Sequence, residues 1–395
     1  MNGLPLPKGY KISVVAAGFR KAEKLDLSLV VSDVPAVAAG VFTTNLFQAA
    51  PVVVGQERLQ AGKPMQAVVV NTGQANACTG DEGIANCRKT LEMVGKAAGL
   101  PAEVILPAST GVIGNQIRMD VFEKAIPGLV ASLGQHSLED LALAMTTTDS
   151  FPKYAAASCE IGGVTVTVSG VAKGAGMICP NMATMLSTVL CDAAVAHQDW
   201  QDLFRRAVDL TFNRVSVDGD TSTNDTLYGL ANGAAGVTVA GEDLAVLEAA
   251  LVDVLGQLAY KLVEDGEGAT KVMRITVKGA ACMADAEKIA RSVGHSQLVK
   301  TAMYGKDANW GRIVCAVGYA GVALDPKAVR LNLCGVELFR NGQPTDADFE
   351  TLLKEPLQQR DIAMDIIVGK GAGEYTFLAS DLGHEYVNIN ADYRS

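Results

Sequence analysis

The chain has 395 residues, of which 49% are hydrophobic and 19% charged, and its formal net charge at pH 7 is −10. This composition is typical of a folded globular protein and excludes a disordered chain. The acidic balance argues against nucleic acid or an anionic membrane surface as a partner, because both bind clustered Lys and Arg, so a small molecule is expected instead.

Up to residue 183 the sequence predicts strands first, then mainly helices, and then strands again. Short apolar runs between Gly, Pro and Asp predict strands, whereas apolar residues at helical spacing predict helices. Ser137 precedes one of these helices and Glu139 and Asp140 lie in its first turn, as an N-cap and the helix dipole favour. The expected strands are residues 11–19, 27–32, 36–44, 68–70, 104–106 and 155–171, and the expected helices are residues 84–98, 119–133 and 138–145.

After residue 184 the pattern restarts. A polar stretch at 218–225 is too rich in Gly and hydroxyl groups for regular structure, and the absence of a Pro-rich linker predicts two halves, 1–183 and 184–395, interleaved in one structure. The α/β alternation defines the expected fold class. Strands are expected at 185–191, 272–277, 329–333 and 362–368, and helices at 198–212, 242–263, 284–301 and 346–353.

The eight cysteines stand singly, and none of the four histidines is next to a cysteine or another histidine. This spacing does not favour zinc, so we expect buried, reduced thiols and no metal. The first residues lack the regions of a secretory signal peptide, and no stretch approaches the ~20 apolar residues of a membrane span. We therefore expect a cytoplasmic protein.

The most unusual segment is KGAGMICPNMATML, residues 173–186. Gly and Pro turn formers lead directly to Thr184 at the head of a hydrophobic strand. One interpretation is an ordinary loop between two strands, in which Thr184 is present because β-branched residues favour strands. The other is a strained loop in which the Thr184 hydroxyl attacks the bond between Ala183 and Thr184.

Cleavage at that bond would give Thr184 a free α-amine beside its own hydroxyl. A Thr hydroxyl is a poor nucleophile unless a base removes its proton, and an N-terminal amine with a pKa of about 7.7–8.0 supplies that base. No histidine is then required, in agreement with their scarcity. Residue types alone leave both interpretations open.

The chain resembles the ornithine acetyltransferase family, also called bifunctional glutamate N-acetyltransferase, over essentially its whole length. The segment GMICPNMATML resembles the family's self-cleavage signature, in which the cut falls before Thr. Further similar motifs stand in order along the chain: NTGQANA at 71–77, PASTGVIG at 107–114, TTDSFPK at 147–153, DGEGATK at 265–271 and NINADYRS at 388–395.

This resemblance implies the layered α/β (α+β) fold of ornithine acetyltransferases and the aminopeptidase DmpA. Autoproteolysis would give an α chain, 1–183, and a β chain, 184–395, assembled as two α and two β chains. Acetyl would move from N2-acetylornithine to Thr184 and then to glutamate, which releases ornithine and N-acetylglutamate in arginine biosynthesis. Some members also take acetyl from acetyl-CoA, and no cofactor is implied.

The same resemblance implies roles for individual residues. The Thr110 hydroxyl and the Gly111 N–H would form an oxyanion hole, for which a Gly backbone is suited. Two residues depart from the family pattern: Ser395 stands where Thr is frequent, and Gln74 replaces an expected Asn. The implied substrate-binding residues are Thr147, Lys173, Thr184, Glu267, Asn390 and Ser395.

Two other classes of function remain open. An N-terminal-nucleophile hydrolase or aminopeptidase would pass the acyl group from Thr184 to water, and release of free acetate without glutamate would favour it. A non-catalytic metabolite-binding protein of the same fold would keep an uncut chain. Nucleotide binding is not favoured, because the glycine-rich stretches 173–176 and 369–373 match neither GxGxxG nor a P-loop.

Overall fold

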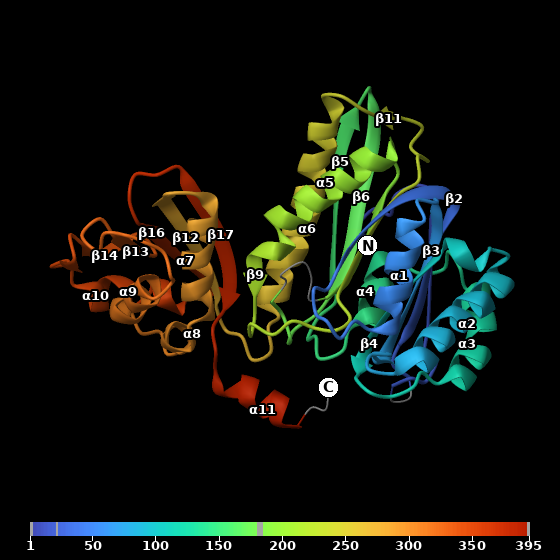
Figure 1. Ribbon diagram of the computed structural model, residues 1–395, viewed down its shortest axis with the longest axis horizontal. Coiled ribbons are helices and arrows are strands. Elements are labelled where there is room, and N and C mark those ends of the chain that lie inside the picture. The colour runs from blue at the N-terminus through green and yellow to red at the C-terminus, as the bar shows by residue number, and fades with distance from the viewer. Residues whose placement is uncertain (1–2, 21–22, 180–184, 393–395) are drawn as a thin grey trace. The chain divides into compact units, whose positions relative to one another are not determined.

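The computed structural model describes residues 3–20, 23–179 and 185–392. The chain divides into two compact units: unit 1 comprises residues 1–213, 220–262 and 394–395, and unit 2 comprises 214–219 and 263–393. Each unit has its own sheet and hydrophobic core, and Figure 1 labels the elements. None of the helices in the described ranges combines the length and apolar character needed to cross a membrane.

The sheet of unit 1 has the strand order β4-β3-β2-β10-β7-β6-β5, with β1 paired to β2. β2 (Leu27–Phe42) is one strand where the sequence predicts two. Its first part pairs with β1 and β3, and beyond a register shift between Val31 and Ala36 its second part pairs with β10. The break between the two predicted strands therefore corresponds to the place where β2 changes its pairing partners from β1 and β3 to β10. Two short strands, β8 Ala194–Val195 and β11 Thr238–Val239, pair with each other in a separate two-stranded sheet. The other strands of the main sheet are β1 Tyr10–Val15, β3 Met65–Gln74, β4 Ile105–Val112, β5 Lys153–Ile161, β6 Val164–Lys173, β7 Leu186–Cys191 and β10 Thr226–Ala231.

Helices cover both faces of this sheet. Val68 and Val70 of β3 pack with α4, whereas Ala67 and Val69 pack with α2 and α3, as the two-residue period of a strand requires. α2 and α3 lie side by side over that second face (Figure 1). α4 begins after the predicted N-cap Ser137. The helices are α1 Ala50–Gln60, α2 Gly80–Ala98, α3 Met119–Ala131, α4 Leu138–Met145, α5 His197–Leu210 and α6 Asp243–Glu264, and short 3-10 turns span Ala102–Val104 and Phe212–Arg214.

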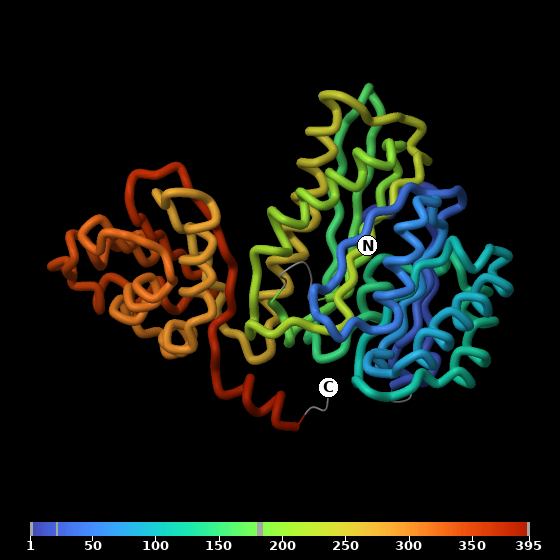
Figure 2. The backbone as a smooth tube through the Cα atoms, in the orientation of Figure 1, coloured from blue at the N-terminus to red at the C-terminus, as the bar shows by residue number. Residues whose placement is uncertain are grey.

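Strands from both sides of position 184 share this sheet. β7 pairs antiparallel with β6, which precedes that position, and parallel with β10, which follows it. β10 in turn pairs with β2 from the beginning of the chain. All six residues of β7 are buried, and Figure 2 shows β6 and β7 running side by side. The sequence-predicted interleaving of the two halves is thus present within unit 1.

Unit 2 has the strand order β15-β14-β13-β16-β12-β17-β9, with helices packed on β12 and β17. The prediction of one helix over 284–301 is wrong, because Ser296 is extended and its hydroxyl caps a second helix by accepting the Val299 N–H at 3.3 Å. The strands are β9 Val215–Ser216, β12 Val272–Ala280, β13 Arg330–Leu333, β14 Val336–Arg340, β15 Gln343–Pro344, β16 Asp361–Ile367 and β17 Gly373–Ser380; the helices are α7 Met283–His295, α8 Gln297–Tyr304, α9 Trp310–Gly318, α10 Phe349–Leu353 and α11 His384–Asp392, with a 3-10 turn at Pro356–Gln358.

The cysteines are free thiols, but they are not all buried. Cys78, Cys282 and Cys315 are exposed, so the expectation of burial is wrong for these three, and Cys159 and Cys334 are only half-buried. Burial raises the pKa of Cys87 and Cys191 to about 12, so these two are unreactive packing residues. The mixed helices and sheets of the two units confirm the α/β fold class.

Candidate active site

Thr110 and Gly111 lie where β4 leaves the core of unit 1. β4 pairs in parallel with β3, with Thr110 opposite Thr72 and Gly111 opposite Gly73. The first five residues of β4 are buried, whereas Thr110 and Gly111 are partly exposed. The two predicted oxyanion-hole residues therefore stand on a rigid strand end that emerges from packed structure.

Gly111 allows β3 and β4 to approach closely at this end. Its φ is +132°, and a Cβ built on it would lie 2.6 Å from the Gln74 nitrogen and closer still to the Gly73 backbone. Any other residue would separate the two strand ends or force them to shift. The glycine at this position thus has a local structural requirement.

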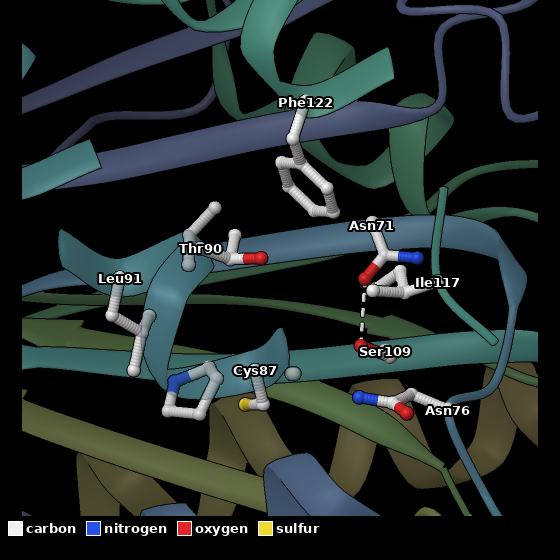
Figure 3. A pocket seen from close by; sticks show the side chains of 11 residues that line it. Asn71, Asn76, Cys87, Thr90, Leu91, Ser109, Ile117 and Phe122 are labelled. Carbon is white, nitrogen blue, oxygen red and sulfur yellow. Dashed lines mark hydrogen bonds between the residues drawn. The ribbon is translucent and has the colours of Figure 1, made fainter. Parts of the chain in front are cut away.

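A small cavity lies on the opposite face of β4 from Thr110. Its lining includes Asn71 of β3 and Ser109 of β4, and Figure 3 shows the Ser109 hydroxyl donating to Asn71 Oδ1 at 2.6 Å. The cavity volume of about 10 Å³ suits roughly one water molecule and not an amino acid. Because strand residues alternate between faces, Thr110 points away from it, so the cavity is not the substrate site.

Gln74, the last residue of β3, binds the loop that follows β4. Its Nε2 donates to the Gln116 carbonyl at 2.9 Å, and its Oε1 accepts the Arg118 N–H at 2.9 Å. The departure from the family pattern at this position therefore places a side chain that binds the backbone of two residues near the end of that loop.

Lys173, at the end of β6, reaches the same region as Thr110. Its ammonium donates to the Thr110 hydroxyl at 3.4 Å. Lys173 and Thr110 are 63 residues apart in the chain. The structure thus brings together two residues that the sequence analysis named for different roles.

A fully buried ion pair joins two loops beside Lys173. The carboxylate of Asp149 lies 2.7 Å from the Lys153 ammonium, and neither side chain is exposed. Asp149 Oδ2 accepts the Thr147 N–H at 2.8 Å, and Oδ1 accepts the Gly174 N–H at 2.6 Å. Burial alone would raise the pKa of Asp149, but the charges of Lys153 and Lys173 and the hydrogen bonds outweigh it and lower this pKa to about 2. The carboxylate therefore stays ionised.

Arg20 holds the loop of Thr147 from its other side. One guanidinium nitrogen donates to the Thr146 carbonyl at 2.5 Å, and another donates to the Thr147 carbonyl at 3.1 Å. With Asp149 binding its N–H, Thr147 has both backbone polar groups fixed. An otherwise irregular loop is thereby held in place.

Glu267 and Asn390 meet in unit 2. Glu267 is 8% exposed, and its Oε2 accepts a hydrogen bond from Asn390 Nδ2 at 2.7 Å. Asn390 belongs to α11. The predicted ammonium-binding carboxylate thus has an amide donor from the helix near the end of the chain.

Three predicted residues, Ala183, Thr184 and Ser395, lie outside the described residues. Within the described ranges, no cluster of three or more His, Cys, Asp or Glu side chains is placed to hold a metal ion.

Four residues that support the site were not predicted from the sequence. Asp149 and Lys153 lie inside the quoted motif TTDSFPK, four residues apart, but were given no role; Arg20 carried no signal. Asn224 lies in the polar stretch 218–225, and its side chain binds backbone next to Thr110. Such a polar run outside regular structure is the signal that could have indicated buried hydrogen-bonding residues.

Comparisons with known proteins indicate one family over nearly the whole chain. A model of the ArgJ family matches residues 11–395. The arginine biosynthesis bifunctional protein ArgJ of Nitratidesulfovibrio vulgaris is 66% identical over 389 residues, 98% of this chain and 99% of that protein. The protein of the same name from Geobacter sulfurreducens is 47% identical over 394 residues, 98% and 99% of the two chains. A solved structure of the Bacillus halodurans protein of that name is 34% identical, covers 52% of this chain and 97% of its own, and has a TM-score of 0.49.

We expect Asp149→Asn to lower the free energy of unfolding by about 3–5 kcal/mol at pH 7, because it removes the carboxylate that offsets the buried Lys153 charge. Since the pKa of Asp149 is lowered from 3.8 to about 2, its stabilisation is present above pH 4 and is lost as the pH falls towards 2. Urea denaturation at pH 7 and pH 3 should show the gap between wild type and variant narrowing in acid.

The control for this prediction is Asp33→Asn, which breaks the exposed pair with Lys11. Exposed ion pairs contribute little to the free energy of unfolding, so the urea midpoint of this variant should be nearly that of the wild type. Equal losses in both variants, or a gap that stays constant in acid, would contradict the assignment of Asp149 as a buried, ionised group.

Gly111→Ala should destabilise the protein more than Gly114→Ala. Both glycines have positive φ, +132° and +87°, but a Cβ at Gly114 has nothing within 4 Å whereas one at Gly111 meets the β3 backbone. Both substitutions place an Ala at a positive φ, which is less favourable at Gly111, and the close approach of β3 and β4 adds to the loss of thermal unfolding midpoint only at Gly111. Equal midpoints would show that the strand ends are not tightly packed.

Proposed function

The chain belongs to the ArgJ family, and from that premise we propose that it transfers acetyl from N2-acetylornithine to glutamate in arginine biosynthesis, through a covalent intermediate on Thr184. One geometric observation carries the chemistry. Thr110 and Gly111 leave the core together, and the Lys173 ammonium donates to the Thr110 hydroxyl at 3.4 Å. Because that hydroxyl accepts from Lys173, its own proton can be directed to a developing oxyanion.

In the proposed first half-reaction, the amine of a free N-terminal Thr184 takes the hydroxyl proton as Oγ attacks the acetyl carbonyl. The carbonyl oxygen becomes negative and is stabilised by the Thr110 hydroxyl and the Gly111 N–H. The C–N bond to ornithine then breaks, and the proton passes to the leaving amine. The products are ornithine and acetyl-Thr184.

In the second half-reaction, the amine of glutamate attacks the acetyl-Thr184 ester, and the same donors stabilise the second oxyanion. N-acetylglutamate leaves as the proton lost by the glutamate amine passes through the Thr184 amine to Oγ, which restores the hydroxyl. Lys173 suits a substrate carboxylate, and Glu267 with its Asn390 partner suits a substrate ammonium. The residues used require no metal or cofactor.

Further features follow from the resemblance as part of the same proposal. Cleavage at Ala183–Thr184 gives α and β chains that assemble in pairs, in the cytoplasm. The word bifunctional in the relatives' names supports a second acetyl donor, and acetyl-CoA is the donor that the resemblance implies. Separate assays of acetylornithine plus glutamate and acetyl-CoA plus glutamate test the two activities.

Hydrolysis of acetyl-Thr184 by water is the second candidate function, since the nucleophile and oxyanion donors would be the same. The relatives are named for arginine biosynthesis, which favours transfer to an amine. Acetate release that does not depend on glutamate would support the hydrolase, and an intact chain that binds substrate without turnover would support a binding protein.

The purified protein should consist of two chains. By proportion of length within 41.2 kDa, their masses are roughly 19 and roughly 22 kDa, and the larger chain should begin with Thr184. Thr184→Ala should remain uncut and inactive, whereas Thr184→Ser should retain some cleavage and transfer because it keeps the oxygen. Denaturing mass spectrometry decides this, and an active, intact wild-type chain would rule out the mechanism.

Acetyl transfer should follow ping-pong kinetics. Initial rates with both substrates varied should give parallel double-reciprocal lines, and acetylornithine alone should add one acetyl group to the larger chain. Thr110→Val should slow both half-reactions by on the order of 10²–10³-fold if its hydroxyl is an oxyanion donor. Intersecting lines without a trapped acetyl group would indicate direct transfer in a ternary complex.

A further inference from the structure

Asn224 binds the ends of the two strands that carry the proposed oxyanion hole. Its side-chain nitrogen donates to the Ala75 carbonyl at 2.5 Å and to the Ser109 carbonyl at 2.8 Å. Ala75 directly follows β3, and the Ser109 carbonyl belongs to the peptide group whose nitrogen is that of Thr110. One amide group thus spans both strands immediately beside Thr110 and Gly111.

The orientation of this amide is itself fixed. The Thr223 hydroxyl donates to Asn224 Oδ1 at 2.7 Å, so the oxygen and nitrogen of the side chain have different partners. The Asn224 N–H donates to the Ser222 hydroxyl at 3.1 Å, and the Asn224 carbonyl accepts from the Thr226 hydroxyl at 2.9 Å. Asn224 is only 5% exposed, so bulk water does not compete for these bonds.

Ser109 is also held on the other side of its strand. Its hydroxyl donates to Asn71 Oδ1 (Figure 3). Asn71 Nδ2 in turn donates to the Gln74 carbonyl at 3.0 Å. Asn71 therefore fixes the Ser109 side chain while Asn224 fixes its carbonyl. The peptide group that leads to Thr110 has little freedom to tilt.

We propose that Asn224 is a positioning residue for acetyl transfer, which fixes the Ser109–Thr110 peptide so that the Thr110 hydroxyl and the Gly111 N–H point at one oxygen. This inference rests on the proposed function of Thr110 and Gly111. Oxyanion donors act by being oriented before the charge develops, and a displacement of 1 Å costs as much as 10²-fold in rate. Asn224 follows position 184 and its two carbonyl partners precede it, so the contact joins the proposed α and β chains.

The variant that tests this role is Asn224→Asp, which keeps the shape of the side chain and replaces its two donors with an acceptor. The matched control is Asn232→Asp. Asn232 is 8% exposed, its amide donates to the Lys8 carbonyl at 3.0 Å, and it follows β10 whereas Asn224 precedes it. Both changes bury a carboxyl near a carbonyl, but only one lies beside Thr110.

Wild-type transfer is measured first, and its absence would refute the proposed function and with it the premise of this inference, whereas the Asn224 variants of an active enzyme test the positioning role alone. Rates are then expressed per molecule that forms acetyl-enzyme, so unfolded or uncut protein does not contribute. We expect Asn224→Asp to lower kcat by on the order of 10–10²-fold in both half-reactions with little change in KM. Asn232→Asp should lower the unfolding midpoint and leave kcat per active molecule within about twofold.

The pH profile separates positioning from general destabilisation. The Asp that replaces Asn224 would lie against two carbonyl oxygens in a buried position, so its protonated form would be favoured. Protonation of this carboxyl group gives it one O–H that can again donate to one of the two strand carbonyls. The ratio of variant to wild-type kcat should therefore rise as the pH falls, whereas a ratio independent of pH would overturn the proposal.

Asn224→Ala provides a second route if the Asp variant does not fold. In a cycle with Thr110→Val, the loss in kcat from Asn224→Ala should largely disappear when Thr110 has no hydroxyl to orient. Strict additivity of the two losses, or a kcat of Asn224→Ala equal to that of wild type, would show that Asn224 does not act through the oxyanion hole.

Discussion

The carboxylate of Asp149 must be matched by donors, because an uncompensated charge in a protein interior costs several kcal/mol. Its donors are the Lys153 ammonium and the backbone of two separate loops, at Thr147 and Gly174. Because the Asp149 carboxylate binds both the loop of Thr147 and the backbone at the end of β6, it holds these two segments at a fixed distance. Lys173, whose ammonium donates to the Thr110 hydroxyl, lies at that end of β6. Packing alone would leave such loops free to adopt several arrangements.

Around this pair, the site combines rigid and irregular parts. Thr110 and Gly111 stand on a strand end fixed by Gly73, Asn71 and Asn224, whereas Thr147 depends on ionic and hydrogen-bonding contacts. Oxyanion donors need precise orientation, and strands provide it. Substrate-binding groups belong to loops, which tolerate the different shapes of two successive substrates.

Local signals in the sequence were enough to predict part of the fold. α4 has the predicted bounds, because its cap and its apolar spacing lie within a few residues. β17 was missed although Tyr375, Phe377 and Ala379 alternate in burial, and α11 was missed because it has no buried face. In the site, Asp149 binds the Gly174 N–H 25 residues away, and Asn224 binds the Ala75 carbonyl 149 residues away. No spacing along the chain encodes contacts of this kind. Thr110 and Gly111 were named through family resemblance alone.

The position of β7 has a consequence for the integrity of the molecule. Its first residue, Leu186, pairs with Lys173 on one side and Thr226 on the other, so the strand after position 184 lies inside a sheet. Breaking one peptide bond there removes the covalent connection but none of these interstrand hydrogen bonds. Dissociation of the two fragments would require the sheet of unit 1, in which all six β7 residues are buried, to come apart, which is equivalent to unfolding that unit. The nicked protein would thus be held together by cooperativity, and dilution alone would not separate its pieces.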